Sequence, residues 1–120
     1  MIIYYNARCS KCRETLEILE KNKCEVTFRE YLKEPPTKKE FTQLLKKLNC
    51  DAFDIVRKTE PLYKERFSSK KLTNTQWIKV LCENPILIER PIVIDGVKAL
   101  VGRPPILVLD FIKKKSSKRT

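Results

Sequence analysis

The chain has 120 residues, 42% of them hydrophobic, and a formal net charge of +11. This length suits one domain with a real core. No apolar run approaches the roughly 20 residues of a membrane-spanning helix, and charges follow the first residues too soon for a signal peptide. Five cysteines, without the dense even spacing of a secreted disulfide scaffold, favour reduced thiols. We therefore expect a cytoplasmic protein with no membrane partner.

The positive charge raises nucleic acid as a partner, but its distribution does not favour a specific one. A basic tail at 113–120 is predicted to be disordered, and the other lysines spread over predicted helix faces. The sequence has no basic stripe interleaved with aromatic residues and no recognised nucleic-acid motif. We expect no specific binding to nucleic acid.

The first third of the chain predicts a strand, a helix and a second strand. The apolar run at 2–5 reads as a short buried strand. The spacing of Cys12, Leu16 and Leu19 then predicts the inner face of a helix. The stretch 26–32 alternates and is rich in strand-forming residues, which predicts the second strand.

The middle of the chain predicts helices. The sequences that begin at Thr37 and Thr73 each place Glu or Gln three residues later, which is the signature of a capping box. The stretch 49–67 is less regular and predicts two short helical pieces. The apolar faces of the two capped helices are predicted from Phe41, Leu44, Leu45 and Leu48, and from Trp77, Val80 and Leu81.

The last third predicts a hairpin and a closing helix. Strands at 91–94 and 97–101 flank Asp95-Gly96, a pair typical of a two-residue type I′ turn. Pro104-Pro105 can open a helix, since proline suits the first turn. The inner face of this helix is predicted from Ile106, Leu109 and Ile112.

The element order predicts a thioredoxin-like α/β fold. It runs β-α-β, several helices, then β-β-α, around a small mixed sheet. We expect a single domain at 1–112 with a helical insertion at about 37–84. In this fold a loop with a cis proline precedes the third strand and faces the reactive cysteine, and Pro91 is the candidate.

Cys9 is the candidate reactive residue. It lies between the first strand and the first helix, where unpaired backbone N–H groups and the helix dipole favour an anion. A thiol there loses its proton easily, and the thiolate is the nucleophile. Cys12 completes Cys-x-x-Cys, which indicates a redox pair, although its spacing also suits a buried helix face. The chain has no histidine, which argues against a zinc site and leaves us expecting no metal.

In its motifs the chain resembles the glutaredoxin-coupled arsenate reductase (ArsC) family, and the resemblance covers nearly its whole length. The motifs that carry it are Asn6-Ala7-Arg8-Cys9, Tyr31-Leu32-Lys33-Glu34-Pro35-Pro36, Val56-Arg57-Lys58, Asn84-Pro85-Ile86-Leu87-Ile88, Arg90-Pro91-Ile92-Val93 and Gly102-Arg103-Pro104.

The resemblance implies an enzyme in which Cys9 attacks arsenate. The substrate-binding set would comprise Asn6, Arg8, Arg57, Arg90 and Arg103. Of these, the last three match the family's oxyanion-binding arginines, and arginine suits this task because its paired donors keep their charge. No cofactor would be bound. Glutathione with glutaredoxin, or a thioredoxin-like protein, would supply the reducing thiol.

Three positions depart from the family pattern. Tyr5 replaces a histidine and Ala7 a proline, and Cys12 is often absent from the reductases. Cys12 can therefore resolve the Cys9 adduct, or it can mark kinship with Spx-type regulators, which bind RNA polymerase through a redox switch. Besides an arsenate reductase and a regulator, the third hypothesis is a general disulfide oxidoreductase. Cys24, Cys50 and Cys82 are expected to be structural.

Overall fold

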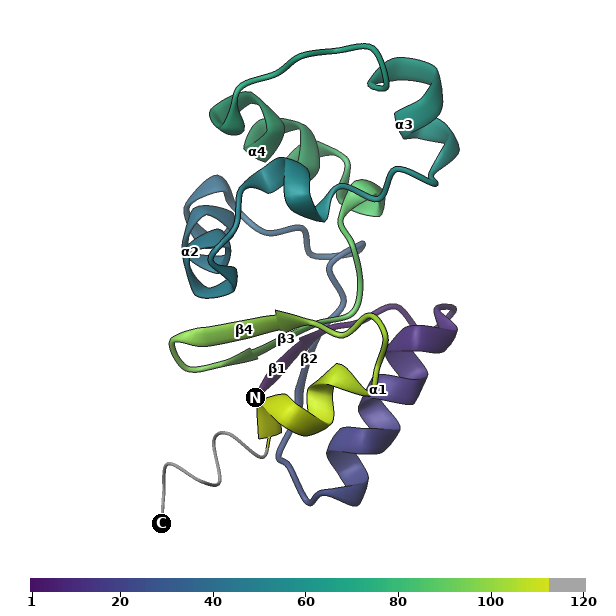
Figure 1. The fold of residues 1–120 in the computed structure, drawn as a ribbon, viewed down its shortest axis with the longest axis vertical. Coiled ribbons are helices and arrows are strands. Elements are labelled where there is room, and N and C mark those ends of the chain that lie inside the picture. The colour runs from purple at the N-terminus through teal and green to yellow at the C-terminus, as the bar shows by residue number, and fades with distance from the viewer. Residues whose placement is uncertain (113–120) are drawn as a thin grey trace. The chain divides into compact units, whose positions relative to one another are not determined.

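Short strands and helices make up residues 1–112, the part of the chain that this computed structural model describes (Figure 1). The basic tail predicted at 113–120 lies outside the described residues. A final helix covers 107–112. The preceding elements are β1 (Ile2–Tyr4), α1 (Ser10–Lys21), β2 (Thr27–Arg29), α2 (Lys38–Leu48), the 3-10 helix η1 (Ala52–Ile55), α3 (Pro61–Arg66), α4 (Asn74–Glu83), the 3-10 helix η2 (Pro85–Leu87), β3 (Ile92–Asp95) and β4 (Lys98–Val101).

The chain divides into two compact units. The sheet unit comprises Met1–Glu30 and the described residues from Arg90 onward, and the helical unit comprises Tyr31–Glu89. The helical unit extends beyond the predicted insertion at about 37–84. One reason is an isolated bridge between Val56 and Ile88, which joins the segment after α4 to the segment after η1.

The sheet unit contains one four-stranded mixed sheet in the order β2-β1-β3-β4. The strand β1 pairs in parallel with β2 and antiparallel with β3, and β3 and β4 form a hairpin. The parallel pair is joined by α1, as a βα-crossover requires. This arrangement confirms the predicted α/β, thioredoxin-like plan.

Two helices cover one face of this sheet (Figure 1). Ile3 and Val93 pair across β1 and β3 and are fully buried, and they form a cluster with Leu19 of α1 and Val108 of the final helix. This cluster packs α1 and the final helix against the sheet.

Two inner faces differ from their predictions. On α1 the buried residues are Cys12, Thr15 and Leu19, while Leu16 is only half-buried. The final helix begins later than Pro104-Pro105 suggested, so Val108 is its buried residue and Ile106 is 59% exposed. In both cases the buried face is set by packing against the sheet, which the spacing of apolar residues in one helix does not determine.

Two strand boundaries also differ. The second strand is shorter than 26–32, because its pairing with β1 ends at the last residue of that strand. The hairpin turn is Gly96-Val97 and not Asp95-Gly96, since Asp95 pairs with Lys98. Gly96 has φ +59 and is the only positive-φ residue of the turn, which suits a type II′ turn instead of a type I′ turn.

In the helical unit, α2 and α4 begin at the capping residues that the sequence predicts. Both capping boxes form: Thr37 caps α2 with Glu40, and Thr73 caps α4 with Gln76. The two short helical pieces are η1 and α3. The apolar centre of the helical unit includes Trp77. The centroid of its ring lies 5.3 to 6.4 Å from the ring centroids of Phe53, Tyr63 and Phe67. None of the helices in residues 1–112 combines the length and apolar character of a membrane span.

Candidate active site

Cys9 is the residue at which α1 begins. It is the N-cap of this helix, with extended backbone angles, and its side chain makes no capping hydrogen bond. The loop before it is closed by Asn6, whose backbone oxygen accepts from the Cys9 N–H at 2.9 Å and whose Oδ1 accepts from the Arg8 N–H at 3.0 Å. The loop therefore presents the Cys9 thiol at the positive end of the helix dipole.

The pKa of the Cys9 thiol is lowered. Burial is the largest single influence and by itself raises the pKa, since Cys9 is only 7% exposed. Hydrogen bonds from the Cys12 backbone and side chain, together with a hydrogen bond and the charge of Arg90, outweigh this burial. Cys9 is thus a nucleophilic thiolate at a lower pH than an ordinary cysteine.

Cys12 behaves in the opposite way. Burial, and then the hydrogen bond and negative charge of Cys9, raise the pKa of the Cys12 thiol to about 12. It is fully buried one turn into α1. The two thiols of the Cys-x-x-Cys motif are therefore unequal, with Cys12 as the proton-bearing donor and Cys9 as the acceptor.

Arg90 is the cation that acts on Cys9. It immediately precedes Pro91, and the Arg90–Pro91 peptide bond is cis, as expected at this position. Arg8 is the arginine adjacent to Cys9 in the chain, but it is exposed. The cis-proline motif was the available signal for Arg90, because that loop faces the reactive cysteine in thioredoxin-like folds.

Arg103 is bound to the backbone of the same loop. Its Nε donates to the Arg90 carbonyl oxygen at 2.6 Å, and the neighbouring Gly102 N–H donates to the Pro91 carbonyl oxygen at 2.8 Å. The Arg103–Pro104 peptide bond is also cis, which the sequence analysis did not anticipate. The sheet unit thus brings together Asn6, Arg8, Cys9, Cys12, Arg90, Pro91 and Arg103.

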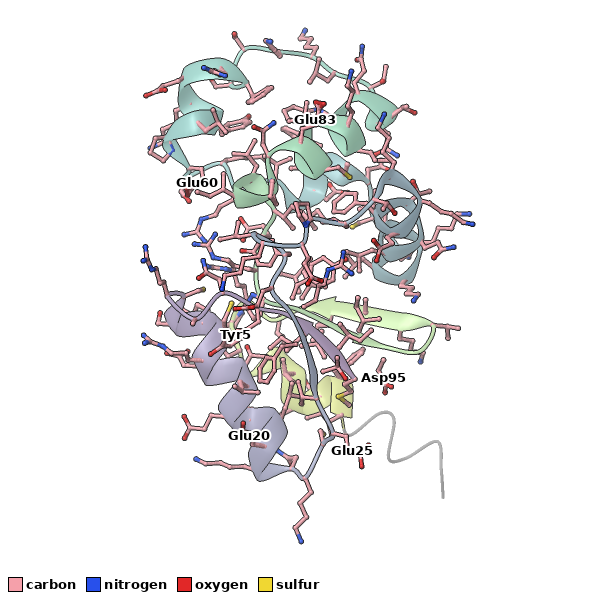
Figure 2. All side chains as sticks on the ribbon, turned by 180° about the vertical axis from the view of Figure 1, so that it is seen from behind. Tyr5, Glu20, Glu25, Glu60, Glu83 and Asp95 are labelled. Carbon is pink, nitrogen blue, oxygen red and sulfur yellow. The ribbon has the colours of Figure 1, made fainter. Side chains whose placement is uncertain are left out.

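Arg57 belongs to the helical unit. Its backbone N–H donates to the Leu87 carbonyl oxygen at 2.6 Å, and its Nε lies 3.5 Å from Oε2 of Glu60. Figure 2 labels Glu60, which stands at the N-cap of α3. The partner carboxylate was not singled out from the sequence, although its spacing of three residues was a usable signal.

Tyr5 occupies the position where the family usually has a histidine. Its ring, labelled in Figure 2, belongs to the sheet unit. It packs against Phe28 of β2 with centroids 5.1 Å apart. Ala7, in the place of the usual proline, is exposed. Neither residue carries a charge, and the cation that acts on Cys9 is Arg90, which keeps its charge near neutral pH.

The remaining cysteines lie away from this loop in the sequence. Burial, followed by the charges of Asp54 and Asp51, raises the pKa of Cys50. Burial is also the main cause of the raised pKa of Cys82, and Cys24 is half-buried. Within residues 1–112 no group of Cys, Asp or Glu side chains is arranged to hold a metal ion.

Comparisons with known proteins agree on one family. The model of the ArsC family matches residues 4–111. The chain is 39% identical to an arsenate reductase of Haemophilus influenzae, over 93% of this chain and 98% of that protein. It is 41% identical to the protein YfgD of Escherichia coli, over 92% and 94%. The solved structure of an arsenate reductase from Vibrio cholerae matches with a TM-score of 0.85 at 37% identity, covering 91% of this chain and 94% of that one.

Proposed function

Since the chain belongs to the ArsC family, we propose that it is an arsenate-reductase-like thiol oxidoreductase with Cys9 as its nucleophile. The observation that carries the proposal is the lowered pKa of Cys9 beside Arg90 at the start of α1. Relatives that span the chain almost end to end are named arsenate reductases, which supports arsenate as the substrate. Because the reaction needs reduced thiols, we infer a cytoplasmic enzyme.

In the first step the Cys9 thiolate attacks arsenic. A sulfur–arsenic bond forms, and one arsenate oxygen leaves as water after it gains protons. Arg90 suits this step because its charge serves both the thiolate and the incoming anion. We assign oxyanion binding to Arg57, Arg90 and Arg103, whose guanidinium groups match oxyanions with paired donors, and we add Arg8 at the exposed side of the loop.

In the second step another thiol attacks the Cys9 sulfur. The sulfur–arsenic bond breaks and its electron pair stays on arsenic, so As(V) becomes As(III) while the two sulfurs are oxidised to a disulfide. We propose Cys12 as this resolving thiol, its proton leaving with the departing arsenite. Once Cys9 is bonded to arsenic, the thiolate that raises the pKa of Cys12 is gone. The attack of Cys12 therefore becomes easier only after the adduct forms. A thiol donor then reduces the disulfide.

The test is arsenate-dependent consumption of NADPH, coupled in parallel to glutathione with glutaredoxin and to thioredoxin. We expect turnover with the wild type, none with Cys9→Ser, and an altered donor preference with Cys12→Ser. Cys24→Ser is the matched control, since Cys24 lies outside the Cys-x-x-Cys motif. Mass spectrometry of protein quenched during turnover should find a Cys9–Cys12 disulfide. Its absence would contradict the resolving role and leave glutathione as the second thiol.

A second candidate is a general disulfide oxidoreductase. It is favoured by the unequal pair, a low-pKa Cys9 with a buried neutral Cys12, which suits attack on any accessible disulfide. Such an enzyme would reduce insulin without arsenate. The hypothesis of an Spx-type regulator is tested by measuring binding to the α subunit of RNA polymerase. A regulator would bind this subunit differently in its reduced and oxidised states.

A further inference from the structure

The two segments that flank the β3–β4 hairpin are bound to each other at Arg90–Pro91 and Gly102–Arg103. The hairpin register pairs Ile92 with Val101 as its outermost residues. Beyond this pair the contacts continue, through the 2.8 Å bond from the Gly102 N–H to the Pro91 oxygen and the 2.6 Å bond from Arg103 Nε to the Arg90 oxygen. These two hydrogen bonds therefore fix the backbone of the loop before β3 as far as Arg90.

Gly102 is also the point where this hairpin end meets α1. A Cβ at this residue would lie 3.0 Å from Thr15 Oγ1, 3.1 Å from Pro91 Cγ and 3.3 Å from Val108 Cγ2. These distances are tighter than most real Cβ contacts, so a side chain at this position would require the neighbouring side chains to move by a few tenths of an ångström. Thr15 lies one turn after Cys12 on the buried face of α1. The helix that carries both thiols thus packs directly on the residue that binds the Pro91 carbonyl.

We propose that Arg103 is a positioning residue: together with Gly102 it fixes the Arg90–Pro91 backbone against α1, and so holds the Arg90 side chain at Cys9. We call these two residues, Gly102 and Arg103, the clamp. The inference deepens the proposed function, because it concerns the same nucleophile. It assigns to Arg103 a task that precedes substrate binding and that acts through the main chain of Arg90.

The chemistry of arginine allows both tasks. A guanidinium group has five N–H donors in a fixed plane, and the bond to the Arg90 oxygen uses the one on Nε. The other donors lie on the two terminal nitrogens of the same plane. Lysine carries its donors on a single terminal nitrogen and offers no Nε donor of this kind to the carbonyl. The clamp therefore uses a donor that an arginine has and a lysine lacks.

The clamp has a consequence for Cys9. Arg90 lowers the pKa of the Cys9 thiol through a hydrogen bond and through its charge, and both depend on a short distance. If the Arg90 backbone is released, its side chain samples other positions and the Cys9 pKa rises. The effect appears in the free protein, without arsenate.

The test is the pH dependence of Cys9 alkylation by iodoacetamide. Cleavage after Glu14 gives a peptide of residues 1–14, in which mass spectrometry separates modification of Cys9 from that of Cys12. We expect Arg103→Gln and Arg103→Lys to raise the midpoint of Cys9 alkylation by about one pH unit, which lowers the rate below both midpoints about tenfold. Lys21→Gln is the control, since it also removes one positive charge but lies about 18 Å along α1 from Cys9.

A second pair of variants tests the clamp without removing a charge. Gly102→Ala should raise the midpoint, because its Cβ pushes against Thr15 and Pro91. Adding Thr15→Ala should restore part of the shift, since it removes the nearest atom. Thr15 Oγ1 is buried and has no hydrogen-bond partner within residues 1–112, so this second change breaks no hydrogen bond. These variants remain informative if Arg103→Gln fails to fold.

The outcomes separate the clamp from the proposed function. A low wild-type midpoint that stays unchanged in Arg103→Gln and in Gly102→Ala would overturn the clamp alone. An ordinary wild-type midpoint would contradict the observation that carries the proposed function. A raised midpoint in these variants would support the clamp even if the protein reduces no arsenate.

Discussion

The two units hold their arginines in different ways. In the sheet unit, Arg90 interacts with the Cys9 thiol, and the backbone around it is bound by Gly102 and Arg103. In the helical unit, Arg57 lies beside a carboxylate, Glu60, from the same turn of chain. One arginine is engaged with the nucleophile, whereas the other is paired with a carboxylate of its own unit.

This difference indicates that Arg90 and Arg57, although both belong to the motifs of the family, have separate tasks. We expect changes around Arg90 to alter the reactivity of the thiol itself, with or without arsenate. Changes around Arg57 should alter the affinity for the oxyanion and leave the thiol unaffected. The following predictions test that separation, from the largest expected effect to the smallest.

Removal of the nucleophile should have the largest effect. We expect Cys9→Ser to lower arsenate turnover by at least about a thousandfold, because a serine hydroxyl at this position has no base to activate it. The coupled NADPH assay measures the loss. Cys24→Ser should keep near wild-type turnover, and turnover that survives Cys9→Ser would contradict the assigned nucleophile.

Removal of the Arg90 charge should have the second-largest effect on turnover. With Arg90→Gln, the Cys9 pKa loses two of the influences that lower it, so it rises. The acid limb of the turnover–pH profile should move to higher pH by about one unit, which is a loss of about tenfold at pH values below both midpoints. The same shift should appear in arsenate-free alkylation. An unmoved limb would show that Arg90 serves only the substrate.

Arg57→Gln should act on substrate affinity alone. We expect the KM for arsenate to rise about tenfold, the cost of about 1.4 kcal/mol from one lost charged contact, while the midpoint of Cys9 alkylation stays at the wild-type pH. Steady-state kinetics and alkylation on the same preparation provide both values. A shifted midpoint would mean that the two units share control of the thiol.

Glu60→Gln should lower the KM for arsenate, which is the opposite of the effect expected for Arg57→Gln. The Arg57–Glu60 contact is long at 3.5 Å and partly exposed, so its contribution is below about 1 kcal/mol. Without the carboxylate, Arg57 is more available to an anion, and the KM should fall by up to about fivefold. A KM that rises would indicate that Glu60 orients Arg57 for binding.

The smallest effect should come from the helix caps of the helical unit. Thr37→Ala and Thr73→Ala each remove an observed capping box and should lower the free energy of unfolding by about 1 kcal/mol. Chemical denaturation followed by circular dichroism measures the loss. Alkylation of Cys9 in native buffer should be unchanged, and a shift would tie the thiol to the stability of the helical unit.

Local chemistry was predictable from the sequence, and long-range contacts were less so. The capping boxes and the position of Cys9 at a helix start depend on residues within four positions of one another. The cis bond at Pro91 followed from the fold type. The Gly96-Val97 turn was missed by one residue, because register is set by the pairing of whole strands and not by the turn pair alone.

The sequence placed Arg90 near the site through its cis-proline motif, but it did not show that Arg90 is the cation at Cys9 or that Gly102 contacts α1. Arg8 is adjacent to Cys9 in the chain, yet its side chain is exposed and Arg90 supplies the charge. Likewise Thr15 has a polar side chain that argues against burial, and it is buried because Gly102 makes room beside it. Such contacts depend on which elements pack together, and the periodicity of one element does not contain that information.

The sheet unit is assembled from the two ends of the chain, with the helical unit between them. Cys9 and Arg90 are therefore far apart in the sequence, and they lie beside the paired strands β1 and β3. The influence of Arg90 on the thiol requires that the sheet unit be folded. Unfolding of this unit would therefore remove two of the influences that lower the Cys9 pKa, so the reactivity of the thiol reports on the integrity of the sheet.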